Sequence, residues 1–170
     1  MALNDPFDND NLGDVLIVDP NAFGRKLMTT MVAELGCRCT VVAENVTDAL
    51  AALVADNVDL VIADHRPSMS AIGGLLRSLR QASEPHFQNM TVLSSTDGID
   101  RGFVDTVGRI GVDGIVATPC SSRTLADRIF SARGIWHQQM TSAERPCAVY
   151  GSMPCDEEPA QLTLFPLPSR

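Results

Sequence analysis

The chain has 170 residues, a formal net charge of −8, 45% hydrophobic and 20% charged residues, which suits one globular domain of roughly 100–150 residues with extensions. The acidic balance argues against a direct nucleic-acid surface, which needs basic residues, and against binding to anionic membranes. No apolar run reaches about 18 residues and the acidic N-terminus lacks a basic, apolar leader, so we expect a cytoplasmic protein without a membrane span.

The first half of the chain alternates between strand and helix patterns. Residues 14–18 (DVLIV) form an apolar run that predicts a buried strand. A helix is predicted over 21–35, with Gly36 as its stop. Its apolar stripe recurs at every fourth residue: Phe23, Leu27, Met31 and Leu35. Residues 39–43 (CTVVA) predict a second strand, and a second helix follows that can end at Asn57. The stripe of this second helix contains four residues: Ala49, Leu50, Leu53 and Val54.

The second half repeats the alternation. Residues 58–64 (VDLVIAD), 90–96 (MTVLSST) and 114–118 (GIVAT) predict the third, fourth and fifth strands. Helices are predicted over 73–82 and 99–110, with Gly111 after the latter. A last helix, capped by Ser121 or Ser122, has a stripe of four residues: Leu125, Ile129, Ala132 and Trp136.

Strands that alternate with helices predict an α/β fold with a parallel sheet covered on both faces. Right-handed crossovers favour the flavodoxin-like (βα)5 doubly wound sheet, with strand order 2-1-3-4-5. We expect this domain over 14–140, after a flexible N-terminus of residues 1–13. Residues 141–170 hold five prolines and no helix stripe, which predicts a flexible, disordered tail.

Two carboxylates end strands at the same edge of the predicted sheet. Asp19 follows the first strand and Asp64 ends the third, and these strands are neighbours in the expected order. Converging carboxylates can hold a hard cation such as Mg²⁺, and one of them could attack a phosphoryl group. Alternatively, both are solvated loop residues or helix caps.

The wider pattern resembles the receiver domain of bacterial two-component response regulators over about residues 14–137, in the segments VLIVDPNAFGRKLM, DLVIADHRPSM, TVLSSTD and GVDGIVATPCSSRTL. The resemblance implies that Asp64 is the phospho-acceptor and Asp19 the first acid of a Mg²⁺-binding pair. It also implies that Thr96, or else Ser95, is the hydroxyl that ends strand four, and that Pro119 is the family's proline. The implied partners are a histidine kinase, a phosphotransferase or another regulator.

The sequence departs from the family pattern at four places. Pro20 stands where the second acid belongs, Thr118 where a lysine belongs, and Ile115 where a switch aromatic is frequent, while Pro67 arrives one residue early. The first change removes a hard oxygen ligand, so Mg²⁺ should bind weakly at Asp19 and Asp64, if at all. The second removes a charge-assisted contact worth about 1.5–3 kcal/mol.

These departures favour a stand-alone atypical receiver, a degenerate form that acts as a signalling protein-interaction module, with weak or no Mg²⁺-dependent phosphorylation at Asp64. A conventional phospho-accepting response regulator is the alternative. An enzyme is not indicated, because the sequence shows no glycine-rich phosphate loop, Ser-His-Asp grouping or HExxH motif, and its three histidines lie in unrelated segments.

The tail segment Gln161–Phe165 (QLTLF) resembles the pentapeptide with which bacterial proteins dock onto the DNA-polymerase sliding clamp. The resemblance implies a replication-associated adaptor, with Gln161 as a polar contact, Leu162 beside it, and Leu164 and Phe165 as apolar anchors. The alternative is a short apolar segment that packs back on the domain.

Cys37 and Cys39 alternate along a predicted strand and should face the same side. A zinc site would need two more ligands at a suitable spacing. Because no clear pair is available, we expect reduced thiols.

Overall fold

The computed structural model of the protein describes residues 12–64, 69–99, 101–139, 146–147 and 165–166. One parallel sheet contains β1 (Asp14–Val18), β2 (Cys39–Ala43), β3 (Leu60–Asp64), β4 (Thr91–Thr96) and β5 (Gly114–Ala117). The helices are α1 (Ala22–Glu34), α2 (Val46–Ala55), α3 (Met69–Gln81), α4 (Pro85–Gln88), α5 (Arg101–Ile110) and α6 (Ser122–Gln139). A separate antiparallel pair joins β6 (Pro146–Cys147) to β7 (Phe165–Pro166).

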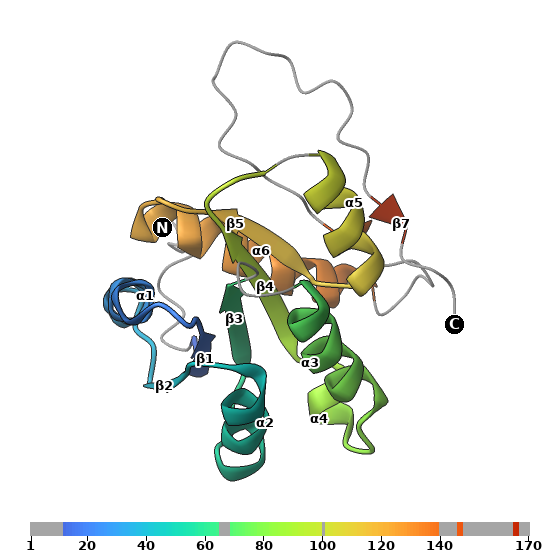
Figure 1. Cartoon of the computed structure of the whole chain (residues 1–170), viewed down its shortest axis with the longest axis horizontal. Helices are drawn as coiled ribbons and strands as arrows, with labels where there is room; N and C mark the ends of the chain where they lie inside the picture. Colours follow the sequence, from blue (N-terminus) through green and yellow to red (C-terminus); the bar gives the residue numbers. More distant parts are fainter. Residues whose placement is uncertain (1–11, 65–68, 100, 140–145, 148–164, 167–170) are drawn as a thin grey trace, which may run out of the picture.

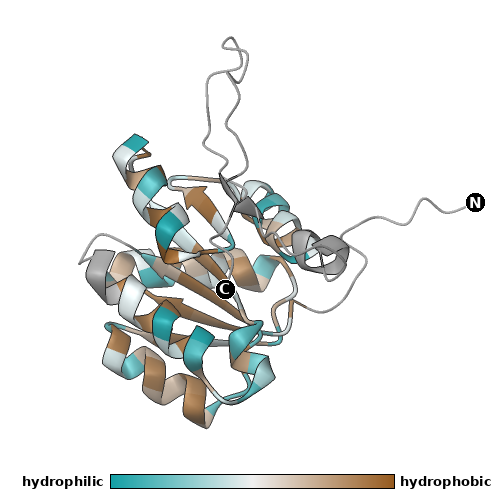
Figure 2. Cartoon of the chain, turned by 90° about the vertical axis from the view of Figure 1, so that its right-hand side faces the viewer, coloured by the Kyte–Doolittle hydropathy of each residue, from teal (hydrophilic) through white to brown (hydrophobic). Residues whose placement is uncertain are grey.

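The sheet has the strand order β2-β1-β3-β4-β5, which confirms the flavodoxin-like prediction. Every residue of β3 and β4 is buried, as expected for parallel strands that helices cover on both faces. In Figure 2 the strands are largely apolar along their length, whereas the helices alternate between apolar and polar residues. No helix in the described ranges is both long and apolar enough to cross a membrane.

Two apolar clusters fill the space on the two faces of the sheet, because successive strand residues point to opposite sides. Helices α2, α3 and α5 pack on one face and α1 and α6 on the other (Figure 1). The first cluster includes Leu53, Leu75, Phe103, Val107 and Ile115. The second includes Met28, Val32, Leu125, Ile129 and Ala132.

Only part of the apolar stripe predicted for helix α1 faces the core, because Met31 is buried and Leu35 packs on the second cluster, whereas the start of the stripe is exposed. Phe23 is 73% exposed and Leu27 42% exposed, whereas Met28, Met31 and Val32 are buried. Positions four apart drift by about 40° per step around a helix of 3.6 residues per turn, so a strict i, i+4 row leaves the buried face. The prediction was also wrong for Val54 on α2, which is 84% exposed.

Helix boundaries follow local signals. Gly36 and Gly111 have φ values of 77° and 86°, so each is a left-handed stop that favours glycine, as predicted. Ser121 caps α6 by accepting the Thr124 N–H at 3.1 Å. Helix α3 begins at Met69 instead of residue 73, and the four-residue helix α4, which opens on Pro85, was not predicted.

A buried ion pair ties α3 to the strands at one side of the sheet. The Arg80 guanidinium donates to a carboxylate oxygen of Asp113 at 2.9 Å and to the carbonyl oxygens of Gln88 and Met90 at 3.0 and 2.8 Å. The same Asp113 oxygen accepts the Val92 N–H at 2.8 Å. Because the side chains of Arg80 and Asp113 are 16% and 7% exposed, this network is shielded from most water.

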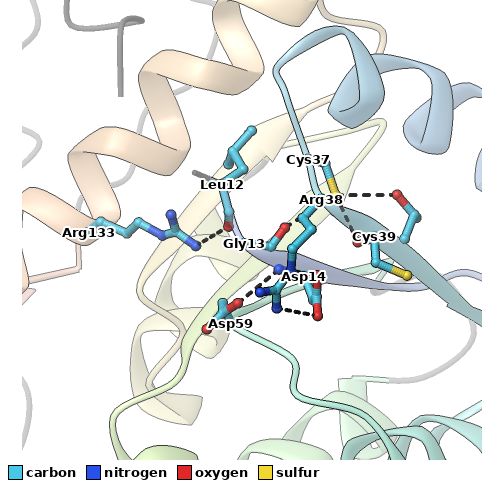
Figure 3. A network of polar contacts seen from close by, with 9 residues as sticks. Leu12, Gly13, Asp14, Cys37, Arg38, Cys39, Asp59 and Arg133 are labelled. Carbon is cyan, nitrogen blue, oxygen red and sulfur yellow. Dashed lines mark hydrogen bonds and ion pairs between the residues drawn. The ribbon is translucent and has the colours of Figure 1, made fainter. Parts of the chain in front are cut away.

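A second polar network lies at the amino edge of the sheet (Figure 3). Arg38 binds both carboxylate oxygens of Asp14, at 2.8 and 2.6 Å, which holds the pKa of Asp14 below its usual value. Asp59 accepts the Asp14 N–H at 2.9 Å. Gly13 has a φ of 71°, and a Cβ there would lie 2.2 Å from an Asp59 oxygen, so this turn requires glycine. The network joins the starts of three neighbouring strands.

Candidate functional site

The carboxyl edge of the sheet gathers the polar residues that the sequence singled out. Strands β1 and β3 are neighbours, with Val18 opposite Ala63, so Asp19 and Asp64 follow these positions at the same edge. Both acids are buried, with exposed fractions of 7% and 4%. Asp64 is in register with Ser95 of β4, so the two side chains start from adjacent positions about 4.8 Å apart.

Asp19 is turned toward the start of α1. One of its carboxylate oxygens accepts the Asn21 N–H at 2.7 Å, and a Cβ added at Gly24 would lie 2.1 Å from the other. The site therefore needs glycine at position 24 for space. The N-terminus of a helix favours a negative charge, so Asp19 stabilises α1 in this position.

Arg25 is a positively charged neighbour of Asp19 that the sequence analysis did not single out. Its guanidinium donates to the Asp19 carbonyl oxygen at 2.7 Å and pairs with Glu44 at 2.7 Å. The side chain is 15% exposed. Arg25 thus joins the ends of β1 and β2 to the first turns of α1. No spacing signal marks such a contact in advance.

The pocket hydroxyls Thr96 and Thr118 bind backbone groups. Thr118 donates its N–H and its hydroxyl to the Thr96 carbonyl oxygen, at 2.6 and 3.0 Å. The Thr96 hydroxyl donates to the Gly98 carbonyl oxygen at 2.7 Å and accepts the Gly98 N–H at 3.0 Å. The peptide bond between Thr118 and Pro119 is cis. These contacts close the edge between β4 and β5.

The residues at this edge provide an incomplete set of ligands for a divalent cation. Asp19 and Asp64 supply carboxylates, but Pro20, which is exposed, supplies no side-chain ligand. Within the described ranges no three His, Cys, Asp or Glu side chains gather as a metal site would require. Among the described residues, Cys37 and Cys39 therefore do not belong to a group of metal ligands. The Cys37 thiol donates to the Cys39 carbonyl oxygen at 2.8 Å.

Ile115 lies inside the core, fully buried next to Ser94 of β4. Pro67 and the tail residues Gln161, Leu162 and Leu164 lie outside the described residues. Phe165 belongs to β7, where its backbone is paired with Cys147.

Comparisons with known proteins agree with this geometry. No family model matches the sequence. The chemotaxis protein CheY of Pseudomonas aeruginosa is 29% identical over 116 residues, which cover 68% of this chain and 91% of that protein.

Solved receiver domains share the fold. The receiver domain of a Syntrophus aciditrophicus signal transduction histidine kinase is 25% identical, with a TM-score of 0.60 over 72% of this chain and 92% of that one. The receiver domain of a Pseudomonas aeruginosa sensor histidine kinase, solved with a magnesium ion in its active-site cleft, is 17% identical, with a TM-score of 0.61 over 71% of this chain and 97% of that one.

The sequence match, the strand order and the acids at the carboxyl edge lead to one assignment. The chain contains a CheY-like response-regulator receiver domain, which is a signalling module of two-component systems.

Proposed function

We propose that this receiver acts mainly by binding protein partners, and that Asp64 accepts a phosphoryl group weakly or not at all. The observation that carries the proposal is Thr118 at the carboxyl edge. It has no charge, and its hydroxyl is bound to the Thr96 carbonyl oxygen at 3.0 Å. It therefore offers no cation to an incoming phosphoryl group, and a charge-assisted contact of about 1.5–3 kcal/mol is lost.

The contacts of the Asp19 carboxylate support the same proposal. Its carboxylate accepts the Asn21 N–H and packs on Gly24, so part of its hydrogen-bonding capacity is already used at the start of α1. Pro20 cannot substitute as a ligand. Weak Mg²⁺ binding and weak phosphorylation follow together, because a phosphoryl group brings charge that a cation would have to neutralise.

An exposed apolar pair on α1 supports binding to proteins. Phe23 and Leu27 lie one turn apart and are 73% and 42% exposed. Helix α1 begins directly after Asn21, its N-cap, so a partner on this helix would lie beside the acidic pocket. Adjacent exposed apolar side chains on a charged domain are typical of interaction sites. A histidine kinase or a phosphotransferase is the partner class that we propose.

The phosphorylation arm is tested with acetyl phosphate and Mg²⁺, followed by intact-mass measurement under conditions that preserve acyl phosphates. We expect the unmutated protein to stay mostly unmodified. Pro20→Asp combined with Thr118→Lys should raise the modified fraction, and adding Asp64→Asn should abolish the gain. Near-complete modification of the unmutated protein, lost in Asp64→Asn, would establish the conventional phospho-accepting alternative.

The binding arm uses purified histidine kinase dimerisation domains and phosphotransferases encoded in the same genome. We expect a partner that binds the unmutated protein and Asp64→Asn equally well, and that is lost in Phe23→Ser with Leu27→Ser. The matched control is Val54→Ser, which removes a similarly exposed apolar side chain from α2. Equal losses in both variants would contradict a docking role for α1.

A second proposal rests on the sequence of Gln161–Phe165 alone: this pentapeptide docks onto a DNA-polymerase sliding clamp. Burying a Leu or a Phe contributes about 1.5–3 kcal/mol each, so Leu164→Ala with Phe165→Ala should weaken a micromolar complex beyond detection. Calorimetric titration of purified clamp gives the affinity, and thermal unfolding gives the stability of the domain. Unchanged clamp binding, or a fall of several degrees in melting temperature, would refute the proposal.

A further inference from the structure

Ser94, in the middle of β4, has a buried hydroxyl that needs a physical explanation. The residue is 1% exposed, and its Oγ has no hydrogen-bond partner among the residues that the structure describes. Its neighbours in register are Ala63 and Ile115, which offer only apolar side chains. A buried hydroxyl without a partner is destabilising, because it gives up its hydrogen bonds to water.

The face on which Ser94 lies is covered by α5 together with α2 and α3. Side chains two apart in a strand share a face, so Ser94 points to the same side as Val92. That side holds the cluster to which Ile115, Phe103 and Val107 belong. Lifting α5 would remove Phe103 and Val107 from the cluster and give water access to this side of β4.

Helix α5 has little stability of its own. Its ten residues, RGFVDTVGRI, include Gly102 and Gly108 together with three β-branched side chains in the interior. Glycine disfavours a helix by about 1 kcal/mol relative to alanine, and a helix this short is marginal without packing. Docking of its buried residues on the sheet therefore decides whether α5 is formed.

We propose that the Ser94 hydroxyl is a conformational device that keeps α5 weakly docked, so that α5 opens before the rest of the domain. The hydroxyl lacks a partner when α5 is closed and gains water when α5 lifts, which lowers the free energy of opening. Opening exposes the apolar face of α5. It also frees the segment that follows Thr96, whose hydroxyl holds Gly98 in the closed arrangement. The inference does not depend on phosphorylation of Asp64 or on the partner of α1.

Amide hydrogen exchange of the full chain, read by mass spectrometry of peptides or by NMR, tests the proposal. Ser94→Ala removes the hydroxyl without adding bulk. We expect exchange in residues 101–110 to slow by at least about fivefold, because an unsatisfied buried hydroxyl shifts an equilibrium by about that factor or more. Amides of β1 and β3 that exchange only when the whole domain unfolds should slow as well, because unfolding hydrates the same hydroxyl, but in the unmutated protein they should already exchange more slowly than those of α5.

The matched control is Ser95→Ala, the adjacent serine, whose side chain points to the opposite face of the sheet and which should leave α5 unchanged. Ser94→Thr, which keeps the hydroxyl, should retain fast exchange in α5. The proposal is overturned if α5 exchange is unchanged or faster in Ser94→Ala. It is equally overturned if α5 exchanges no faster than β1 and β3 in the unmutated protein, or if Ser95→Ala gives the same result.

Discussion

The buried Arg80–Asp113 pair should contribute more to the free energy of unfolding than an ion pair with an exposed arginine does, and Arg80→Met tests this. The substitution keeps the aliphatic stem but removes the guanidinium that binds Asp113 and two carbonyl oxygens. Removing one partner of a buried pair typically costs about 3–5 kcal/mol. Arg80 is 16% exposed and Asp113 keeps the Val92 N–H, so the lower end, about 3 kcal/mol, is expected.

Urea unfolding followed by circular dichroism measures this loss in free energy. The control is Arg38→Met, which breaks an ion pair in which the arginine is 61% exposed. Its loss should be smaller, since removing an exposed arginine opens Asp14 to water. Adding Asp113→Asn to Arg80→Met removes the buried negative charge and should therefore recover part of the stability. A loss below about 1 kcal/mol, or one equal to that of Arg38→Met, would refute the reasoning that burial sets the cost.

Two further predictions use the titration of side chains. Arg38 lowers the pKa of Asp14 below its usual 3.8. The unmutated protein should therefore be more stable than Arg38→Met near neutral pH, and this difference should disappear as the pH falls through the lowered pKa. Acid unfolding of both proteins measures the difference, and a constant value at all pH values would contradict the prediction. Burial raises the pKa of the Cys120 thiol, whereas Cys39 is exposed, so iodoacetamide at pH 7.5 should modify Cys39 before Cys120. Peptide mapping over time measures the order of these two thiols, and modification of Cys120 before Cys39 would contradict the prediction.

The fold could be predicted from the sequence because its signals are local. Unbroken apolar runs such as residues 60–63 mark strands covered on both faces, and Gly36 and Gly111 mark helix ends through their left-handed backbone. Helix orientation was harder to predict. The predicted stripe was wrong at Phe23 and Leu27, which are exposed, and right at Met31, which is buried beside Met28 and Val32.

The residues of the site were also accessible to sequence reasoning, whereas their contacts were not. The positions of Asp19 and Asp64 at strand ends follow from alternation. The contact of Arg25 with Glu44 spans 19 residues and that of Arg80 with Asp113 spans 33, so no spacing rule anticipates either. The orphaned Ser94 hydroxyl is similar, since a serine in an apolar strand is unremarkable until its neighbours in register are known.

Two pocket residues, Thr118 and Asp19, have structural roles in the domain. Thr118 binds the same carbonyl oxygen of β4 with both its N–H and its hydroxyl, and thereby joins the ends of β4 and β5. Asp19 accepts the Asn21 N–H and lies on Gly24, and thereby fixes the start of α1. In both cases a position that would serve phosphoryl chemistry in the family pattern contributes to the stability of the domain. A receiver whose pocket residues hold its own edge together can present α1 to a partner in one constant arrangement, which is what a binding module requires and a phosphorylation switch does not.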